Sequence, residues 1–95
     1  LHALYKKYQQ ETFFIVTNHG ELVYQAISKA TNHGATILDG EGPYEHTERQ
    51  VVYSVVSSAE SKKVRKAVKE ADPNAFINVI KTERLSGHFY YKPND

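Results

Sequence analysis

Cysteine, methionine and tryptophan are all missing from the 95 residues of this chain. Without cysteine the chain can form neither a disulfide framework nor a thiolate metal site, which excludes the disulfide-rich secreted scaffolds and favours a reducing compartment such as the cytosol. Long apolar runs are missing as well, since the longest, residues 13–16, is far shorter than the roughly 20 residues that cross a bilayer. The first residues do not have the pattern of a signal peptide, and we expect none. We therefore expect a soluble domain in the cytoplasm.

An excess of charge of one sign is also absent. The chain has 12 Lys and Arg against 11 Asp and Glu, so its net charge is +1. Domains that bind nucleic acids usually carry a basic excess, and we therefore expect no nucleic-acid polymer as a partner. The length is that of one domain. Because the first residue is Leu1 rather than Met, we expect this domain to belong to a larger protein.

Six segments show the apolar periodicity of strands or helices. We expect strands at residues 12–17, 35–38, 49–57 and 75–83, and helices at residues 21–32 and 58–71. Gly34 lies where a helix C-cap glycine belongs, and Asp72 and Pro73 are expected to end the second helix. The order βαββαβ predicts an α+β, ferredoxin-like fold, a four-stranded antiparallel sheet with two helices on one face. We expect it to span residues 12–91, between an N-terminal linker or short helix (1–11) and a tail (92–95).

Three of the expected strands carry apolar residues on both faces, although two helices on one side cover only one face. These residues are Phe13 to Val16, then Val51, Val52, Tyr53, Val55 and Val56, and then Phe76, Ile77, Val79 and Ile80. The second face needs a cover, for which the candidates are the N-terminal segment, the aromatic tail at residues 85–95, or a second copy of the domain. We expect a homo-oligomer.

The stretch from residue 39 to 48, DGEGPYEHTE, has the features of a binding loop. Its two glycines permit a close approach of the backbone to a ligand, and its tyrosine offers a ring for stacking. The predicted ligand-binding residues are Asp39, Gly40, Glu41, Gly42 and Tyr44. The alternatives are a plain hairpin connection with solvated charges, or a cation held by the acids, which lack the offsets of an EF-hand. We expect no metal and no cofactor.

Chemistry of other kinds has little support. The chain has no Gly-x-Ser-x-Gly elbow, no recognisable triad and only dispersed histidines, so we expect no enzyme. The tetrad Thr-Asn-His-Gly occurs at residues 17–20 and 31–34, where turn chemistry at the two ends of a helix explains both copies. The second helix carries five cations, at Lys62, Lys63, Arg65, Lys66 and Lys69. Such a face is either solvated or able to meet phosphates or an anionic membrane surface.

Several short motifs then follow in a familiar order: TFFIVT, ATILDGEGPY, VVYSVV, DPNAF and SGHF. On these motifs, over about residues 12–90, the chain resembles the C-terminal soluble domain of YitT-type bacterial membrane proteins, a domain of unknown function (2179). The resemblance implies a ferredoxin-like fold similar to that of PII signalling proteins. The family's glycine turn matches Gly40 and Gly42 with Tyr44, its Asp-Pro-x-Ala-Phe element matches residues 72–76, and its late Gly and Phe match Gly87 and Phe89.

In that family several transmembrane helices precede the domain. The resemblance therefore implies transmembrane segments of the same full-length chain as partners, and a location on the cytoplasmic side of the bacterial cell membrane. We expect a non-enzymatic regulatory or ligand-sensing domain, and alternatively a structural oligomerisation domain that assembles copies of the membrane protein. A small anionic metabolite or nucleotide is the expected ligand, bound between subunits, and it requires Lys62, Lys63 or Arg84 of the same or a neighbouring copy to neutralise the acids of the loop.

Overall fold

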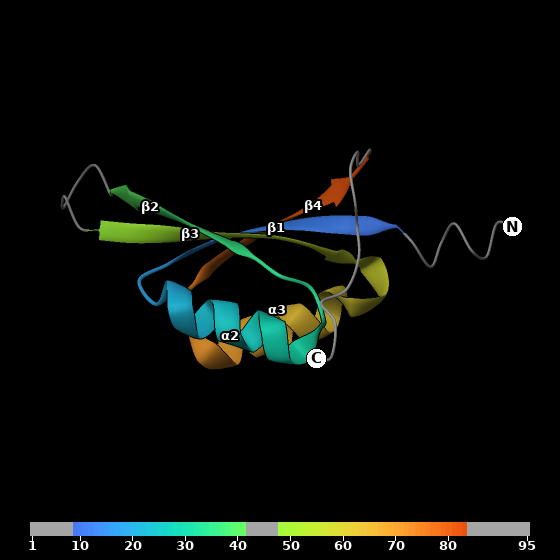
Figure 1. Cartoon of the computed structure of the whole chain (residues 1–95), viewed down its shortest axis with the longest axis horizontal. Coiled ribbons are helices and arrows are strands. Elements are labelled where there is room, and N and C mark those ends of the chain that lie inside the picture. The colour runs from blue at the N-terminus through green and yellow to red at the C-terminus, as the bar shows by residue number, and fades with distance from the viewer. Residues whose placement is uncertain (1–8, 42–47, 84–95) are drawn as a thin grey trace, which may run out of the picture.

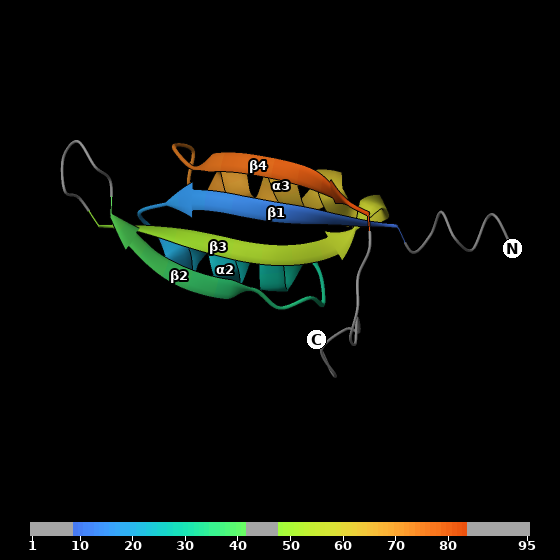
Figure 2. The same ribbon diagram turned by 90° about the horizontal axis from the view of Figure 1, so that it is seen from above.

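A four-stranded antiparallel sheet lies over two helices in the computed structural model, which describes residues 9–41 and 48–83 (Figure 1). The elements in chain order are β1 (Gln10–Thr17), α2 (Gly20–Ala30), β2 (Thr36–Glu41), β3 (Glu48–Ser57), the 3₁₀ turn η1 (Ser58–Glu60), α3 (Ser61–Ala71) and β4 (Phe76–Thr82). The strands are arranged in the order β2-β3-β1-β4 (Figure 2). Both helices cover the same face. The predicted α+β, ferredoxin-like βαββαβ fold is confirmed.

Some element boundaries differ from the prediction. Strand β1 begins at Gln10 rather than at residue 12, so the sheet includes residues assigned to the N-terminal linker. Strand β2 continues to Glu41 rather than ending at Leu38, because Asp39 and Gly40 pair with Gln50 and Arg49 of β3. The predicted helix over residues 58–71 begins with the turn η1 and becomes α-helical only at residue 61. Residues 1–8, 42–47 and 84–95, with the predicted sites Gly42 and Tyr44 and the aromatic tail, lie outside the described residues.

The first helix ends without the glycine cap that the sequence suggested. Its C-cap is Thr31, whose backbone is extended at φ −137° and ψ 177°. The Thr31 N–H and hydroxyl both donate to the Ile27 carbonyl oxygen, at 2.9 and 3.0 Å, and so satisfy the end of the helix. The predictions of a helix through residue 32 and of a glycine C-cap at Gly34 were therefore wrong.

The two Thr-Asn-His-Gly tetrads form similar turns, in which the threonine makes the recurring hydrogen bond rather than the Asn and Gly from which turns were predicted. The Thr17 hydroxyl oxygen accepts a hydrogen bond from the His19 N–H at 2.9 Å, and that of Thr31 accepts one from the His33 N–H at 3.1 Å. A threonine side chain that bonds the backbone two residues later is a common turn device. The tetrad therefore leads into α2 at one end of the helix and leads out of it at the other.

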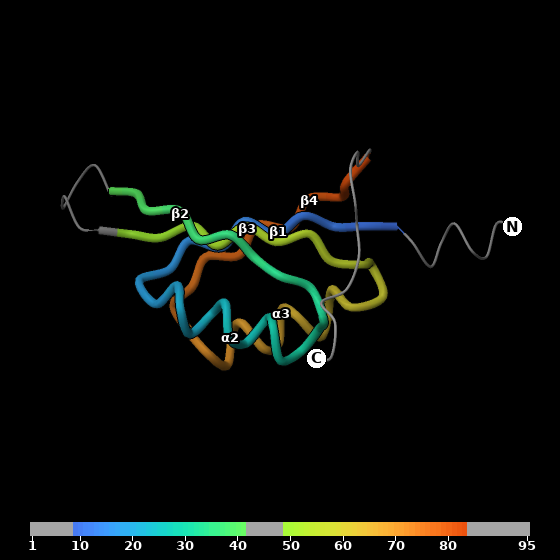
Figure 3. The backbone as a smooth tube through the Cα atoms, viewed as in Figure 1, coloured from blue at the N-terminus to red at the C-terminus, as the bar shows by residue number. Residues whose placement is uncertain are grey.

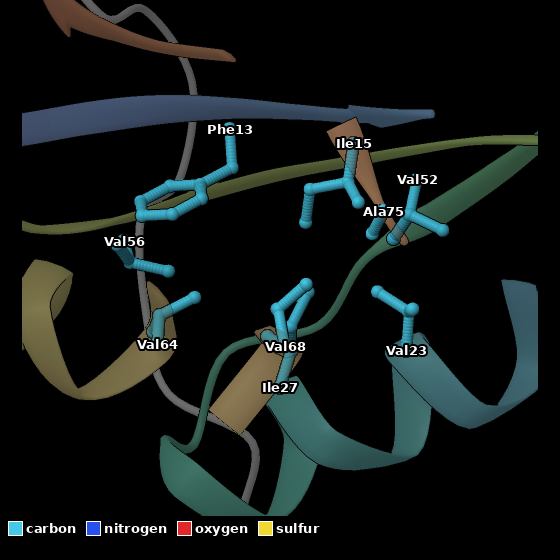
Figure 4. Packing of buried hydrophobic residues seen from close by; sticks show 9 residues of the cluster. All are labelled: Phe13, Ile15, Val23, Ile27, Val52, Val56, Val64, Val68 and Ala75. Atoms are coloured by element: carbon cyan, nitrogen blue, oxygen red, sulfur yellow. The ribbon is translucent and has the colours of Figure 1, made fainter. Parts of the chain in front are cut away.

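The backbone trace shows the sheet and the helices as two layers (Figure 3), and the hydrophobic core lies between them (Figure 4). Alternate residues of the strands point toward the helices, and valines and an isoleucine spaced along one face of each helix meet them. The fully buried members are Phe13, Ile15, Val23, Ile27, Val52, Val56, Val64 and Val68, with Ala75 nearly so. This face of the sheet is thus filled by the two helices.

The opposite face of the sheet is apolar and no helix among the described residues covers it. The strand register aligns Leu38, Val51, Val16 and Phe76 in one row across all four strands. In the next row the rings of Phe14 and Tyr53 lie 5.4 Å apart between centroids. The Phe76 side chain is 69% exposed. The prediction that apolar residues occupy both faces is confirmed.

Candidate functional site

A surface cavity of about 400 Å³ lies at one end of the sheet, where β1 and β2 finish and β3 is beginning. Asn18, Asp39, Gly40 and Gln50 line it. The antiparallel topology brings these residues together, because the C-terminal ends of β1 and β2 flank the N-terminal part of β3. Two of the predicted ligand residues, Asp39 and Gly40, therefore share one cavity, and ligand binding there stays a prediction.

Gln50 connects this cavity to the first turn of α2. Its Oε1 accepts a hydrogen bond from the Gly20 N–H at 2.8 Å, and its Nε2 donates to Asp39 Oδ1 at 3.5 Å. His19, at the N-cap position, makes no side-chain capping bond, so the strand supplies the cap that the helix sequence lacks. A Cβ atom at Gly20 would lie only 2.5 Å from Gln50 Oε1. The glycine at this position therefore permits the contact.

Gly40 has no comparable steric role in the fold. A Cβ atom built there would meet only the Arg49 carbonyl oxygen, at the ordinary distance of 3.6 Å, and the backbone φ lies outside the left-handed region. Another residue would fit the strand. The effect of this glycine is to leave the backbone bare at the cavity wall, where a ligand atom can approach it.

The remaining acids and cations of the prediction are placed differently. Glu41 ends β2, is exposed and does not line the cavity. The first turn of α3, which contains Lys62 and Lys63, lies at the opposite end of the sheet from the C-terminal end of β2 (Figure 1). These lysines therefore do not neutralise the acids of β2 in their own copy, and neutralisation from a neighbouring copy stays a prediction. Arg84 lies outside the described residues.

A buried aspartate fastens the strand end beside the cavity. Asp72 Oδ2 accepts a hydrogen bond from the Thr17 hydroxyl, and its Oδ1 accepts one from the Asn74 N–H at 3.0 Å. The Thr17 hydroxyl lowers the pKa of Asp72 below its ordinary value of 3.8, and the Asn74 N–H and the nearby His19 and Lys69 act in the same direction against burial. Asp72, in the Asp-Pro element of the sequence, thus joins the end of α3 to Thr17 at the end of β1.

A second polar cluster lies away from the cavity, at the junction of β3, η1 and the segment after α2. His33 Nε2 and Glu60 Oε1 are 2.9 Å apart, and the Ser57 hydroxyl donates to the same oxygen at 2.8 Å. His33 is buried. Within residues 9–41 and 48–83, no three His, Asp or Glu side chains gather as a metal site would require. None of the helices described there is long and apolar enough to cross a membrane.

Of the four residues that line the cavity, sequence reasoning singled out Asp39 and Gly40 but not Asn18 and Gln50. The signal that pointed to Asp39 and Gly40 was local, a glycine-rich and acidic stretch between two strands. Gln50 lies in a β-rich segment whose residues gave no reason to single it out. The one available clue was a helix that starts at a glycine without a Ser, Thr, Asp or Asn immediately before it, since such a helix needs a cap from elsewhere.

Known proteins with similar sequences and structures place the chain in a family. The chain is 28% identical over 87 residues to the UPF0750 membrane protein YitT of Bacillus subtilis, covering 92% of this chain but only 31% of YitT. A DUF2179 protein structure from Eubacterium ventriosum is 32% identical with a TM-score of 0.61, covering 75% of this chain and 97% of that one.

The fold is also that of a PII-like protein. The structure of CPII from Thiomonas intermedia, a nitrogen regulatory PII-like protein bound to ADP, AMP and bicarbonate, has a TM-score of 0.54 at 16% identity and covers 82% of this chain and 96% of CPII. The model of the family described as "uncharacterized protein conserved in bacteria (DUF2179)" matches residues 33–87. This match covers more than half of the chain and agrees with the resemblance seen in the sequence. The chain belongs to the DUF2179 family.

Proposed function

We propose that this domain is a non-enzymatic regulatory module on the cytoplasmic side of a bacterial membrane protein, and that it binds a small anionic metabolite or nucleotide at the cavity beside Asp39 and Gly40. The observation that carries the proposal is the cavity itself. It is built on three strand ends, and its wall contains a glycine that the fold does not require. Binding sites are commonly loops and strand ends held by a rigid scaffold.

The lining chemistry suits the nucleoside part of a nucleotide. The Asp39 carboxylate accepts hydrogen bonds, and the Asn18 and Gln50 carboxamides both donate and accept them. Sugar hydroxyls and the edges of bases need these mixed partners, whereas a bare phosphate would be repelled by the carboxylate. We therefore expect a bound nucleotide to place its sugar or base against Asp39 and to direct its phosphates away from this carboxylate.

The comparisons support this assignment by analogy. CPII, which has the same fold, is described as bound to ADP, AMP and bicarbonate, and YitT is described as a membrane protein. The absence of cysteine agrees with a reducing cytoplasm. The described lining holds one carboxylate and two carboxamides but no nucleophile paired with a base, which favours binding over catalysis.

Thermal unfolding of the 95-residue chain with AMP, ADP, ATP and a panel of central metabolites tests the proposal. A true ligand present at 100 times its dissociation constant stabilises the fold by about 2.7 kcal/mol. Asp39→Leu should abolish this shift, because it replaces the carboxylate that lines the cavity by an aliphatic side chain. Glu41→Leu is the matched control, since Glu41 is an exposed acid of the same strand that does not line the cavity. The proposal fails if no compound stabilises the wild type, or if both leucine variants respond equally to a hit.

A second function, structural assembly of the membrane protein, is favoured by the apolar face of the sheet. Leu38, Tyr53, Phe76 and Ile80 are all exposed there. Large exposed apolar patches on a small domain mark interaction surfaces, and a second copy of the domain would cover this one with equally apolar residues. If assembly is the whole function, variants at the cavity will leave the behaviour of the full-length protein unchanged while variants of the apolar face will disrupt it.

A further inference from the structure

Four cations of α3 form a stripe along one side of the helix. Lys62, Arg65, Lys66 and Lys69 follow one another at steps of three and one residues, so they extend over about 10 Å at roughly 1.5 Å per residue. Together with Ile77 and Val79 of β4 they line a surface hollow of about 610 Å³. The stripe therefore lies on the side of α3 that is next to β4, an edge strand of the sheet.

The acidic residues of this region leave most of the stripe without a charged partner. Glu60 bonds His33 and Ser57, and Asp72 bonds Thr17 and attracts only Lys69 among the four cations. Glu70 lines a different hollow, on the side of α3 that faces α2. Among residues 9–41 and 48–83, no carboxylate forms a salt bridge with a cation of the stripe. The positive charge is consequently directed outward.

We propose that this stripe, with Ile77 and Val79, docks the domain onto the anionic surface of the membrane. The proposal rests on the proposed function in one respect, that the domain is part of a membrane protein. Anionic lipid head groups attract cations that lie close to the surface. The long stems of Lys and Arg follow apolar surface while their charges reach the head groups, and the aliphatic side chains between them suit the boundary between head groups and acyl chains.

The docked orientation is compatible with the other surfaces of the domain. Strands β2 and β4 are the opposite edges of the sheet, so docking at β4 leaves the cavity at the end of β2 accessible (Figure 2). The helix-free face of the sheet also remains accessible, because the stripe lies in the helix layer on the other side (Figure 1). A domain held this way can bind a ligand and a second copy while it rests on the lipid.

Vesicle sedimentation with the 95-residue chain tests the docking. The probes are vesicles of phosphatidylcholine alone and vesicles of phosphatidylcholine and phosphatidylglycerol at about two to one. The wild type should bind only the phosphatidylglycerol vesicles, and added salt should release it, because screening shortens the reach of surface charges. The double substitution Lys62→Ala with Lys66→Ala should weaken binding by more than about tenfold, since each cation near an anionic surface contributes about a fivefold gain.

A control pair of substitutions tests whether vesicle binding depends on the stripe itself or only on the net charge of the domain. Lys29→Ala with Arg49→Ala removes two cations outside the stripe and should leave vesicle binding within about twofold of the wild type. A second stripe pair, Arg65→Gln with Lys69→Gln, repeats the test if the first variant is poorly folded by circular dichroism. The proposal is overturned if the wild type does not bind phosphatidylglycerol vesicles at low salt, or if the control pair loses as much binding as the stripe pairs.

Two further measurements distinguish lipid docking from nucleic-acid binding and from ligand binding. If a single-stranded oligonucleotide retains the chain while the vesicles do not, the stripe is a nucleic-acid surface and membrane docking is wrong. Asp39→Leu should keep full vesicle binding, and Lys62→Ala with Lys66→Ala should keep the thermal shift with a ligand. Loss of one readout alone therefore shows whether the docking or the ligand binding has failed.

Discussion

The two faces of the sheet contain almost the same kinds of side chain but have different surroundings. Phe13 and Phe14 are neighbours in β1, yet Phe13 is 0% exposed beneath the helices and Phe14 lies half-buried on the other face beside Tyr53. Val52 and Tyr53 repeat the contrast in β3. One face is buried in the core, and the other is an apolar surface that no helix among the described residues covers. The contrast shows that apolar composition indicates burial only when the topology supplies a cover.

The largest expected effect separates the two faces by adjacent residues. Phe13→Ala should lower the free energy of unfolding by about 3–5 kcal/mol, because it removes a ring from a closed core and leaves a cavity. Phe14→Ala should cost about 1–2 kcal/mol, since its ring is partly hydrated already. Urea unfolding of both variants measures the difference. Equal losses would mean that the second face is also covered in solution, and would contradict the contrast between the faces in the isolated domain.

An intermediate effect on stability is expected at the edge of the covered face, where the Thr17 hydroxyl donates a hydrogen bond to Asp72. The pKa of Asp72 is lowered in the folded state, so its bonds add stability that is present above the ordinary value of 3.8 and is lost as pH falls through the lowered value. Thr17→Val removes the main cause of the lowering. The variant should therefore be less stable at neutral pH and should lose less stability than the wild type on acidification below about pH 4.

Thermal unfolding of the wild type and of Thr17→Val between neutral pH and about pH 3 measures this difference in stability loss. Thr36→Val is the matched control, because Thr36 is an exposed threonine that pairs with Tyr53 on the helix-free face. It should follow the wild type at every pH. If the stability of Thr17→Val falls with acidification as much as that of the wild type, the hydrogen bond from Thr17 does not lower the pKa of Asp72.

The smallest effect on stability comes with the clearest effect on assembly. Phe76→Lys should change the free energy of unfolding by no more than about 0.5 kcal/mol, because the side chain is 69% exposed. It should nevertheless reduce the sedimenting mass, since a charge in the apolar row opposes contact with a second copy. Leu22→Lys changes an equally apolar residue of α2, 56% exposed, and should leave the mass unchanged. A wild type that stays monomeric at every concentration excludes self-association of this domain.

Much of the fold could be predicted from local patterns. Strand alternation and helix periodicity located all six regular elements, and the βαββαβ order limits the topology to the observed sheet. Boundaries were less accurate, because they depend on partners. β2 extends through Asp39 and Gly40 only because β3 pairs with them, and the η1 turn before α3 has no apolar signal of its own. Of the residues that line the candidate site, only Asp39 and Gly40 were singled out from the sequence.

The sequence by itself determined the local structures whose hydrogen-bond partners are close together in the chain. Both Thr-Asn-His-Gly tetrads form the same turn, because a threonine hydroxyl and an N–H two residues later are all that it requires. Only the tertiary structure decided what each turn became. His19 is exposed near the cavity, while His33 is buried against Glu60, a residue 27 positions away. Gln50 caps α2 across 30 residues for the same reason. Partners so distant meet only when the sheet has formed, since their positions depend on the packing of whole elements.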